Sequence, residues 1–182
     1  RKKYKETENT NPNSFYGISK LRGENQIIKF CNSYLIFRVS WLYSLYKNNF
    51  LKFVLEKFIN DEDIYAVNDL YSIPTSSYEL ARFLKNSENY TNKENLNQIY
   101  HFVGNGSPIT WFDFAVQILK NYNKFKKINS KILPISSYDF FQNKIRPQFS
   151  SLDNSKFTQN FNFKIDNWKN SLNETMIKLF DI

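Results

Sequence analysis

Short apolar runs alternate along this chain with longer segments of helical periodicity, and this alternation constrains the fold more than any other feature. Runs long enough for buried strands and too short for helices lie at 34–39, 64–67, 99–103 and 132–135. Helical spacing of apolar residues predicts helices at about 15–32, 49–59, 77–84, 111–122 and 166–180. The alternation predicts an α/β fold with parallel strands, which binds ligands at the carboxyl ends of those strands.

Glycine is scarce, and the four glycines are Gly17, Gly23, Gly104 and Gly106. None of them builds a G-x-G-x-x-G pattern after a strand, and no phosphate loop ending in Lys and Ser or Thr is present. From the residues alone, the chain therefore does not predict a dinucleotide-binding domain. Residues 85–97 are rich in Asn, Lys, Glu and Ser, and predict a surface loop.

The composition excludes several classes of protein. At 182 residues, 41% hydrophobic and 18% aromatic, the chain can bury a sizeable core, whereas disordered chains are poor in aromatics. No apolar run approaches the roughly 18 residues that a membrane helix requires, so we expect no membrane association. The single Cys31 and single His101 exclude an internal disulfide framework and a Cys/His zinc site, and suit the reducing cytoplasm.

The net charge of +8 comes mostly from lysine, in a chain that is also rich in Asn, Phe and Tyr. This pattern indicates a bias of composition rather than a reading surface, and no unbroken basic run is present. We therefore expect no nucleic-acid partner, although steeply salt-dependent binding to duplex DNA would revive that hypothesis. Attraction of a small anionic ligand, such as a nucleotide, is the alternative explanation of the charge.

A candidate catalytic pair lies in the first predicted helix, where Tyr16 and Lys20 are four residues apart and share a face. A neighbouring ammonium favours the phenolate form of a tyrosine, which can then exchange a proton at neutral pH. Such a tyrosine can protonate a carbonyl oxygen as hydride arrives at the carbon. Tyr and Lys are both common in this chain, so the spacing alone does not decide between chemistry and coincidence.

The surrounding residues form a longer pattern, and 11–24 read N-P-N-S-F-Y-G-I-S-K-L-R-G-E. This segment resembles the active-site segment of the extended short-chain dehydrogenase/reductases, in particular the dTDP-4-dehydrorhamnose reductase family. Further resemblances follow in the family's order, at 35–43, 49–50, 69–75, 99–101, 111–115 and 146–153. Leu70 and Ser72 depart from the family's Gln and Gly, which puts the detail of that loop in doubt.

The resemblance implies a Rossmann-type domain that binds the cofactor and a smaller α/β domain that binds the sugar nucleotide. It assigns 1–42 and about 68–104 to the Rossmann part, and about 43–67 and 105–182 to the substrate-binding part. The chain would begin shortly before the catalytic tyrosine, so we expect a C-terminal fragment. The N-terminal half, with the glycine fingerprint and the catalytic Ser or Thr, would be absent, and the fragment alone should bind NADPH poorly.

The activity implied by the resemblance is NADPH-dependent reduction of the C4 keto group of dTDP-4-dehydro-6-deoxy-L-mannose, giving dTDP-L-rhamnose for cell-surface polysaccharides. Tyr16 would be the general acid, and Lys20 would assist it and bind the nicotinamide ribose. The resemblance also implies that Tyr16, Lys20 and Ser40 contact the cofactor. The residues that it implies for substrate contact are Trp41, Asn49, Phe50 and Arg146.

Some points stay open within the resemblance. NADH is an alternative cofactor, Mg²⁺ at an oligomer interface has no support from residues in this sequence, and a homodimer is an expectation of the family. A related nucleotide-sugar epimerase or reductase is the first alternative function. A non-catalytic regulatory subunit of the same superfamily is the second alternative, which the intact Tyr16 and Lys20 oppose and the missing cofactor half favours.

Several conspicuous residues have structural interpretations. We expect Trp111 in the core, His101 as a hydrogen-bonded structural residue, Cys31 as a buried small side chain and Asp69 as a turn or packing residue. An arginine on an apolar strand, here Arg38, is expected to pair with a carboxylate.

Overall fold

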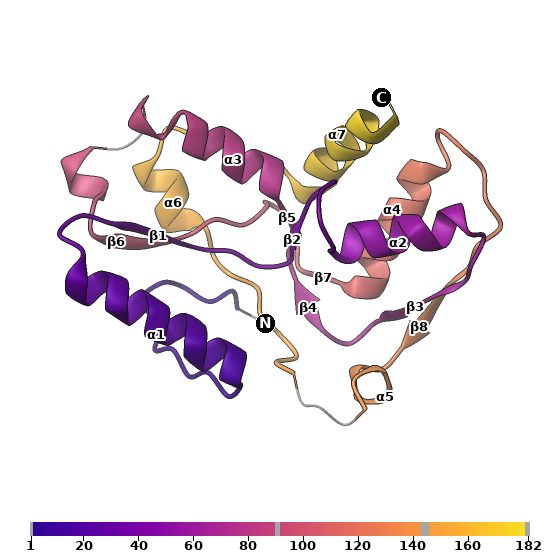
Figure 1. Ribbon diagram of the computed structural model, residues 1–182, viewed down its shortest axis with the longest axis horizontal. Coiled ribbons are helices and arrows are strands. Elements are labelled where there is room, and N and C mark those ends of the chain that lie inside the picture. Colours follow the sequence, from indigo (N-terminus) through magenta and orange to yellow (C-terminus); the bar gives the residue numbers. More distant parts are fainter. Residues whose placement is uncertain (1, 90–91, 143–145, 181–182) are drawn as a thin grey trace.

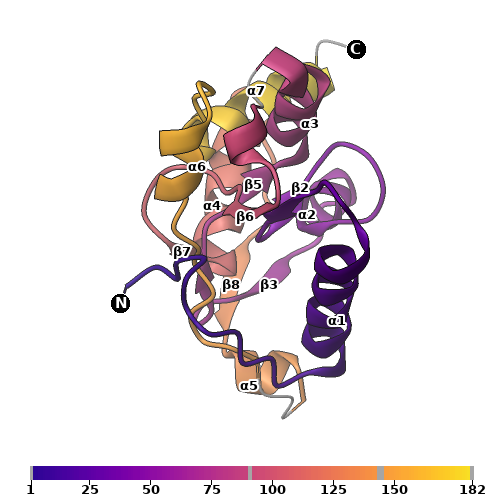
Figure 2. The ribbon, with the colours of Figure 1, turned by 90° about the vertical axis from the view of Figure 1, so that its left-hand side faces the viewer.

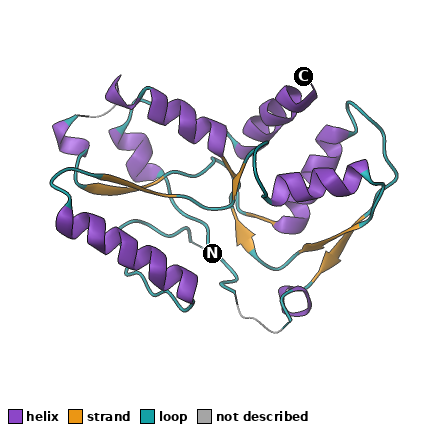
Figure 3. Cartoon of the chain, viewed as in Figure 1, coloured by secondary structure: helices purple, strands orange, loops and turns teal. Residues whose placement is uncertain are grey.

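The computed structural model describes residues 2–89, 92–142 and 146–180 and has the predicted α/β architecture (Figures 1 and 3). Its strands form short pairs that follow one another through the middle of the molecule, with helices around them. Three pairs are parallel: β1 (Leu35–Arg38) with β6 (Gln98–His101), β2 (Leu42–Tyr43) with β5 (Thr75–Ser76), and β3 (Ile64–Val67) with β8 (Ile132–Ile135). The pair of β4 (Tyr71–Ser72) with β7 (Ile109–Thr110) is antiparallel.

The helices match the sequence expectations within two residues at each end. The predicted ones are α1 (Phe15–Phe30), α2 (Phe50–Ile59), α3 (Ser77–Lys85), α4 (Trp111–Tyr122) and α7 (Trp168–Phe180). Two short helices were not predicted, α5 (Ser137–Phe140) and α6 (Ser155–Asn160). The polar segment 85–97 contains two single 3₁₀ turns, Ser87–Asn89 and Lys93–Asn95.

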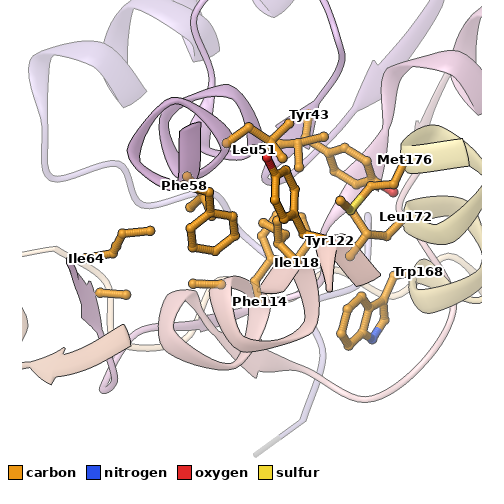
Figure 4. Close-up of a cluster of buried hydrophobic side chains, with 14 of the residues drawn as sticks. Tyr43, Leu51, Phe58, Ile64, Phe114, Ile118, Tyr122, Trp168, Leu172 and Met176 are labelled. Carbon is orange, nitrogen blue, oxygen red and sulfur yellow. The ribbon is translucent and has the colours of Figure 1, made fainter. Parts of the chain in front are cut away.

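A first core fills the space between α2, α4 and α7, where apolar side chains recur on one face of each helix (Figure 4). Phe58 of α2, Phe114 and Ile118 of α4, and Leu172 of α7 are all at most 1% exposed. The strand β3 adds Ile64 and Ala66 to the same cluster. This core is continuous and well covered, which is what makes these helices a firm scaffold.

A second core lies between α3, α6 and the β1–β6 pair, and it consists mainly of aromatic rings. Phe83 of α3 is central, because its ring meets those of Phe102, Phe157 and Phe161 at 5.0–5.9 Å between centroids. The partly buried Phe37 of β1 packs against this cluster. Thus α3 and α6 cover one face of the β1–β6 pair, and α1 lies on the other (Figures 1 and 2).

α1 is poorly covered, because none of its sixteen residues is buried. Phe15, Ile27, Ile28 and Phe30 are among its exposed side chains, with Phe15 94% exposed. β1 beside it pairs with β6 only, so its other edge has no strand partner within the described residues. No helix in those same residues is long and apolar enough to cross a membrane.

Candidate active site

Local sequence fixes where α1 begins. The side chain of Ser14 caps the helix by accepting a hydrogen bond from the backbone N–H of Gly17 at 3.1 Å. Pro12 of the preceding arm lies so close to Gly17 that a Cβ there would come within 2.9 Å of the proline Cβ. A glycine is therefore required at this point of the tyrosine helix for steric reasons.

Tyr16 and Lys20 lie on the exposed surface of α1, and Tyr16 is 75% exposed. Lys20 lines a cavity of about 630 Å³ that also takes in Gly17, Leu21 and Glu24 from the same helix. The rest of its wall comes from the arm at residues 4–13, from the ends of β1 and β6, and from residues 147–152. Tyr16 is not among the described residues that line this cavity.

An ion pair joins α1 to the sheet. Arg38, at the end of β1, donates two parallel hydrogen bonds to the Glu24 carboxylate, from Nε at 2.9 Å and Nη2 at 2.6 Å. Both side chains are about one-fifth exposed, so water screens the pair only partly. The expectation that Arg38 pairs with a carboxylate is confirmed, and this pair sets how the tyrosine helix lies against β1.

His101 stands beside Arg38 in the register of the β1–β6 pair and is 1% exposed. Its Nδ1 lies 3.1 Å from the carbonyl oxygen of Asp153, which can only accept, so Nδ1 carries the proton. Burial lowers the pKa of His101, and the carboxylate of Glu6, 3.9 Å away, opposes that shift. Its Nε2 has no hydrogen-bond partner among the described residues, so His101 is only half satisfied as a structural residue.

The carboxyl end of β1 carries Ser40 and Trp41. The Ser40 hydroxyl donates to the carbonyl of Ile73 at 3.1 Å and accepts from the Ser72 hydroxyl at 3.0 Å. Trp41 has a backbone φ of +43°, a left-handed conformation that is an outlier for a bulky residue. Outliers of this kind persist only where the surroundings hold them, and they cluster at binding sites.

Trp41 belongs to an aromatic cluster through its contact with Trp111. Its ring stacks on that of Trp111 with 3.9 Å between centroids and 16° between planes, and Phe50 lies 4.3 Å from the Trp111 ring. Trp111 is half-buried and packs against the first core, so the expectation of a core role captures only part of its position. The site therefore includes a residue that sequence reasoning did not assign to it.

The contacts of Asn49 and Arg146 are with segments other than α1. Asn49 caps α2 through Lys52 N–H at 3.3 Å, and its amide nitrogen contacts the carbonyl oxygens of Ser44, Tyr46 and Lys47 at 2.9–3.2 Å. The exposed Arg146 places its guanidinium over the Phe141 ring, 4.1 Å from the centroid.

Two further expectations have opposite outcomes. The Asp69 carboxylate accepts hydrogen bonds from the backbone and hydroxyl of Ser137 at 3.0–3.1 Å, which fits the turn or packing role. Cys31 is exposed, so its prediction as a buried side chain was wrong. It is the C-cap residue of α1.

Comparison with known proteins points to one family. The family model described as RmlD substrate binding domain matches residues 1–180. The chain is 31% identical to the dTDP-4-dehydrorhamnose reductase of Escherichia coli K12 over 96% of its own length, and it spans 59% of that relative.

Solved structures agree. A dTDP-4-dehydrorhamnose reductase from Bacillus anthracis in complex with NADP superimposes with a TM-score of 0.85 at 29% identity, covering 97% of this chain and 59% of that one. A dTDP-4-dehydrorhamnose reductase ortholog from Clostridium acetobutylicum superimposes with a TM-score of 0.82 at 32% identity, covering 100% of this chain and 61% of that one. The chain thus spans about three fifths of the length of these relatives.

Proposed function

Because the chain belongs to the RmlD substrate binding domain family, we propose that it is the substrate-binding and proton-donating part of an NADPH-dependent sugar-nucleotide reductase. The reaction is reduction of the C4 keto group of dTDP-4-dehydro-6-deoxy-L-mannose to dTDP-L-rhamnose. The observation that carries the proposal is the Tyr16–Lys20 pair on an exposed helix face, within a chain that the family matches almost from end to end.

Tyr16 acts as the general acid in this proposal. NADPH, when bound, supplies the hydride to C4, and Tyr16 donates its phenolic proton to the C4 oxygen. Lys20 stabilises the phenolate that remains and donates hydrogen bonds to ribose hydroxyls. The residues fit this cofactor, because Lys20 is exposed and lines a cavity of about 630 Å³.

The sugar nucleotide is held by residues from other elements. Ser40 and Trp41 approach the nicotinamide and the sugar, and Phe50 approaches the nucleotide. The guanidinium of Arg146 suits the diphosphate, because its planar fork of N–H donors matches phosphate oxygens. Asn49 contributes through the 44–48 loop, whose carbonyl groups its amide already contacts.

The remaining expectations extend the proposal. Residues 1–42 and about 68–104 belong to the cofactor part, and about 43–67 and 105–182 to the substrate part. We expect action in the cytoplasm and a homodimer. The described residues contain no group of three or more His, Cys, Asp or Glu placed to hold a metal ion, so no side chain of theirs is assigned to Mg²⁺.

The test uses the product of the whole coding sequence, including whatever precedes Arg1. We expect it to oxidise NADPH when dTDP-4-dehydro-6-deoxy-L-mannose is added, and to do so poorly with the corresponding UDP-sugar. Equal turnover with the UDP-sugar would favour a related reductase or epimerase. Binding of the dTDP-sugar with no oxidation of NADPH would favour a regulatory subunit.

A further inference from the structure

We propose that Trp111 is a positioning residue that holds the Trp41 indole as one rigid wall of the sugar-nucleotide site. The inference deepens the proposed function and rests on it. The two residues are far apart in the sequence: Trp41 follows β1, and Trp111 is the first residue of α4. Their parallel rings, 3.9 Å apart between centroids, are the closest aromatic pair of the described residues.

The backbone of Trp41 needs external support. Its φ of +43° is costly for a bulky side chain, and such conformations persist where contacts over-determine them. One support is main-chain, because the carbonyl of Trp41 accepts a hydrogen bond from the Thr75 N–H at 3.2 Å. The stack on Trp111 is the contact that fixes the direction of the side chain.

Trp111 is itself fixed by contacts with other residues. Its ring lies 4.3 Å from that of Phe50 and 6.5 Å from that of Phe114, which is fully buried in the first core. Its backbone starts α4 in a capping box, in which Asp113 accepts from the Thr110 N–H at 2.9 Å and its own N–H donates to the Thr110 hydroxyl at 3.0 Å. The stack is therefore anchored to the first core at one end.

Trp41 has fewer aromatic contacts than Trp111 in this arrangement. Trp111 has aromatic neighbours on more than one side, whereas the ring of Trp41 has Trp111 as its aromatic partner among the described residues. Trp41 is also only half-buried. An apolar ring face, fixed in direction at the carboxyl end of β1, suits the flat or C–H-bearing face of a substrate ring.

The experiment uses the product of the whole coding sequence, with dTDP-L-rhamnose as the probe in calorimetric titration. Replacing Trp111 with Leu should weaken binding about three- to tenfold, the range that loss of one aromatic pair corresponds to. Trp111→Phe, which keeps a flat ring, should recover most of the affinity. Phe112→Leu is the matched control on the same turn of α4, packed against the first core, and should bind as the wild type does.

A spectroscopic reading separates positioning from general damage. Two stacked indoles give an exciton couplet in circular dichroism, which Trp111→Phe and Trp41→Phe should abolish and Trp168→Phe should retain. A couplet that survives in Trp111→Phe, or unchanged affinity in Trp111→Leu, would overturn the inference while leaving the proposed function intact. Failure of the wild-type whole protein to bind the probe would overturn the proposed function, and the role of the stack with it.

Discussion

α4 and α1 begin in the same way and end up in different surroundings. Both start from a hydroxyl cap, Thr110 and Ser14 respectively, that accepts a backbone hydrogen bond at 3.0–3.1 Å. α4 then buries five residues against the first core, whereas α1 buries none. Local sequence is thus sufficient to specify where each helix starts, but only α4 receives its stability from packing within this chain. The proposed catalytic pair lies on the helix that buries none of its residues.

The largest expected difference lies in core truncation. Phe114→Ala should lower the free energy of unfolding by about 3–5 kcal/mol, because it empties a fully buried site on α4. Ile27→Ala on α1 should change it by less than about 0.5 kcal/mol, because Ile27 is 41% exposed. Urea unfolding measures both, and similar losses would mean that α1 is packed after all.

The Arg38–Glu24 pair should be the main attachment of α1. Arg38→Gln and Glu24→Gln should each lower the free energy of opening α1 by about 1–3 kcal/mol, because each leaves a partly buried charge without its partner. Hydrogen exchange should show the loss in α1 amides and not in those of α4. Arg22→Gln, at an exposed position of the same helix, is the control. Additive effects in the double variant would show that the pair is not coupled.

The caps provide a smaller test of the same contrast. Thr110→Ala should cost about 1–2 kcal/mol of global stability, because it removes a capping box from a helix that is part of the core. Ser14→Ala should lower helix content by circular dichroism and leave the urea midpoint unchanged. A shift of that midpoint as large as that of Thr110→Ala would contradict the independence of α1.

The smallest effect concerns pH. Burial between α3 and α7 raises the pKa of Glu79, against the opposing hydrogen bonds from Asp166 N–H and the Ser171 hydroxyl. A raised pKa means that the folded chain holds this proton more tightly than the unfolded chain. Stability from this group is therefore greatest below its ordinary pKa of 4.5 and declines as the pH rises through the raised value.

The corresponding variant is Glu79→Gln, which should remove that decline when unfolding is measured at several pH values above 4.5. Glu174→Gln, at an exposed position of α7, should retain it. An unchanged slope in Glu79→Gln would show that another group is responsible.

Periodicity predicted the long elements because each has enough residues to show a pattern. It missed β2, β4, β5 and β7, which have two residues each and therefore no period. It also missed α6, where Phe157 is the single apolar residue in a polar segment. That helix matters, because Phe157 and the following Phe161 belong to the second core.

The site was predicted through its motifs and not through its contacts. The sequence places Tyr16 and Lys20 on one face of a helix, and the assignment of their roles stays a prediction. The stack of Trp41 on Trp111 joins residues seventy positions apart, and no local pattern reports such a contact. Similarly, the sequence predicted that Arg38 pairs with a carboxylate, but that this carboxylate is Glu24 depends on how α1 lies against β1.

The most direct test of the account is the turnover of Tyr16→Phe in the product of the whole coding sequence, with Tyr65→Phe on β3 as the control. Both tyrosines are more than half exposed, so neither change should disturb folding. We predict that Tyr16→Phe reduces kcat for dTDP-4-dehydro-6-deoxy-L-mannose by about 10²- to 10⁴-fold, the usual contribution of a general acid, while its affinity for dTDP-L-rhamnose is retained. Near-normal turnover in Tyr16→Phe would contradict the proposed mechanism.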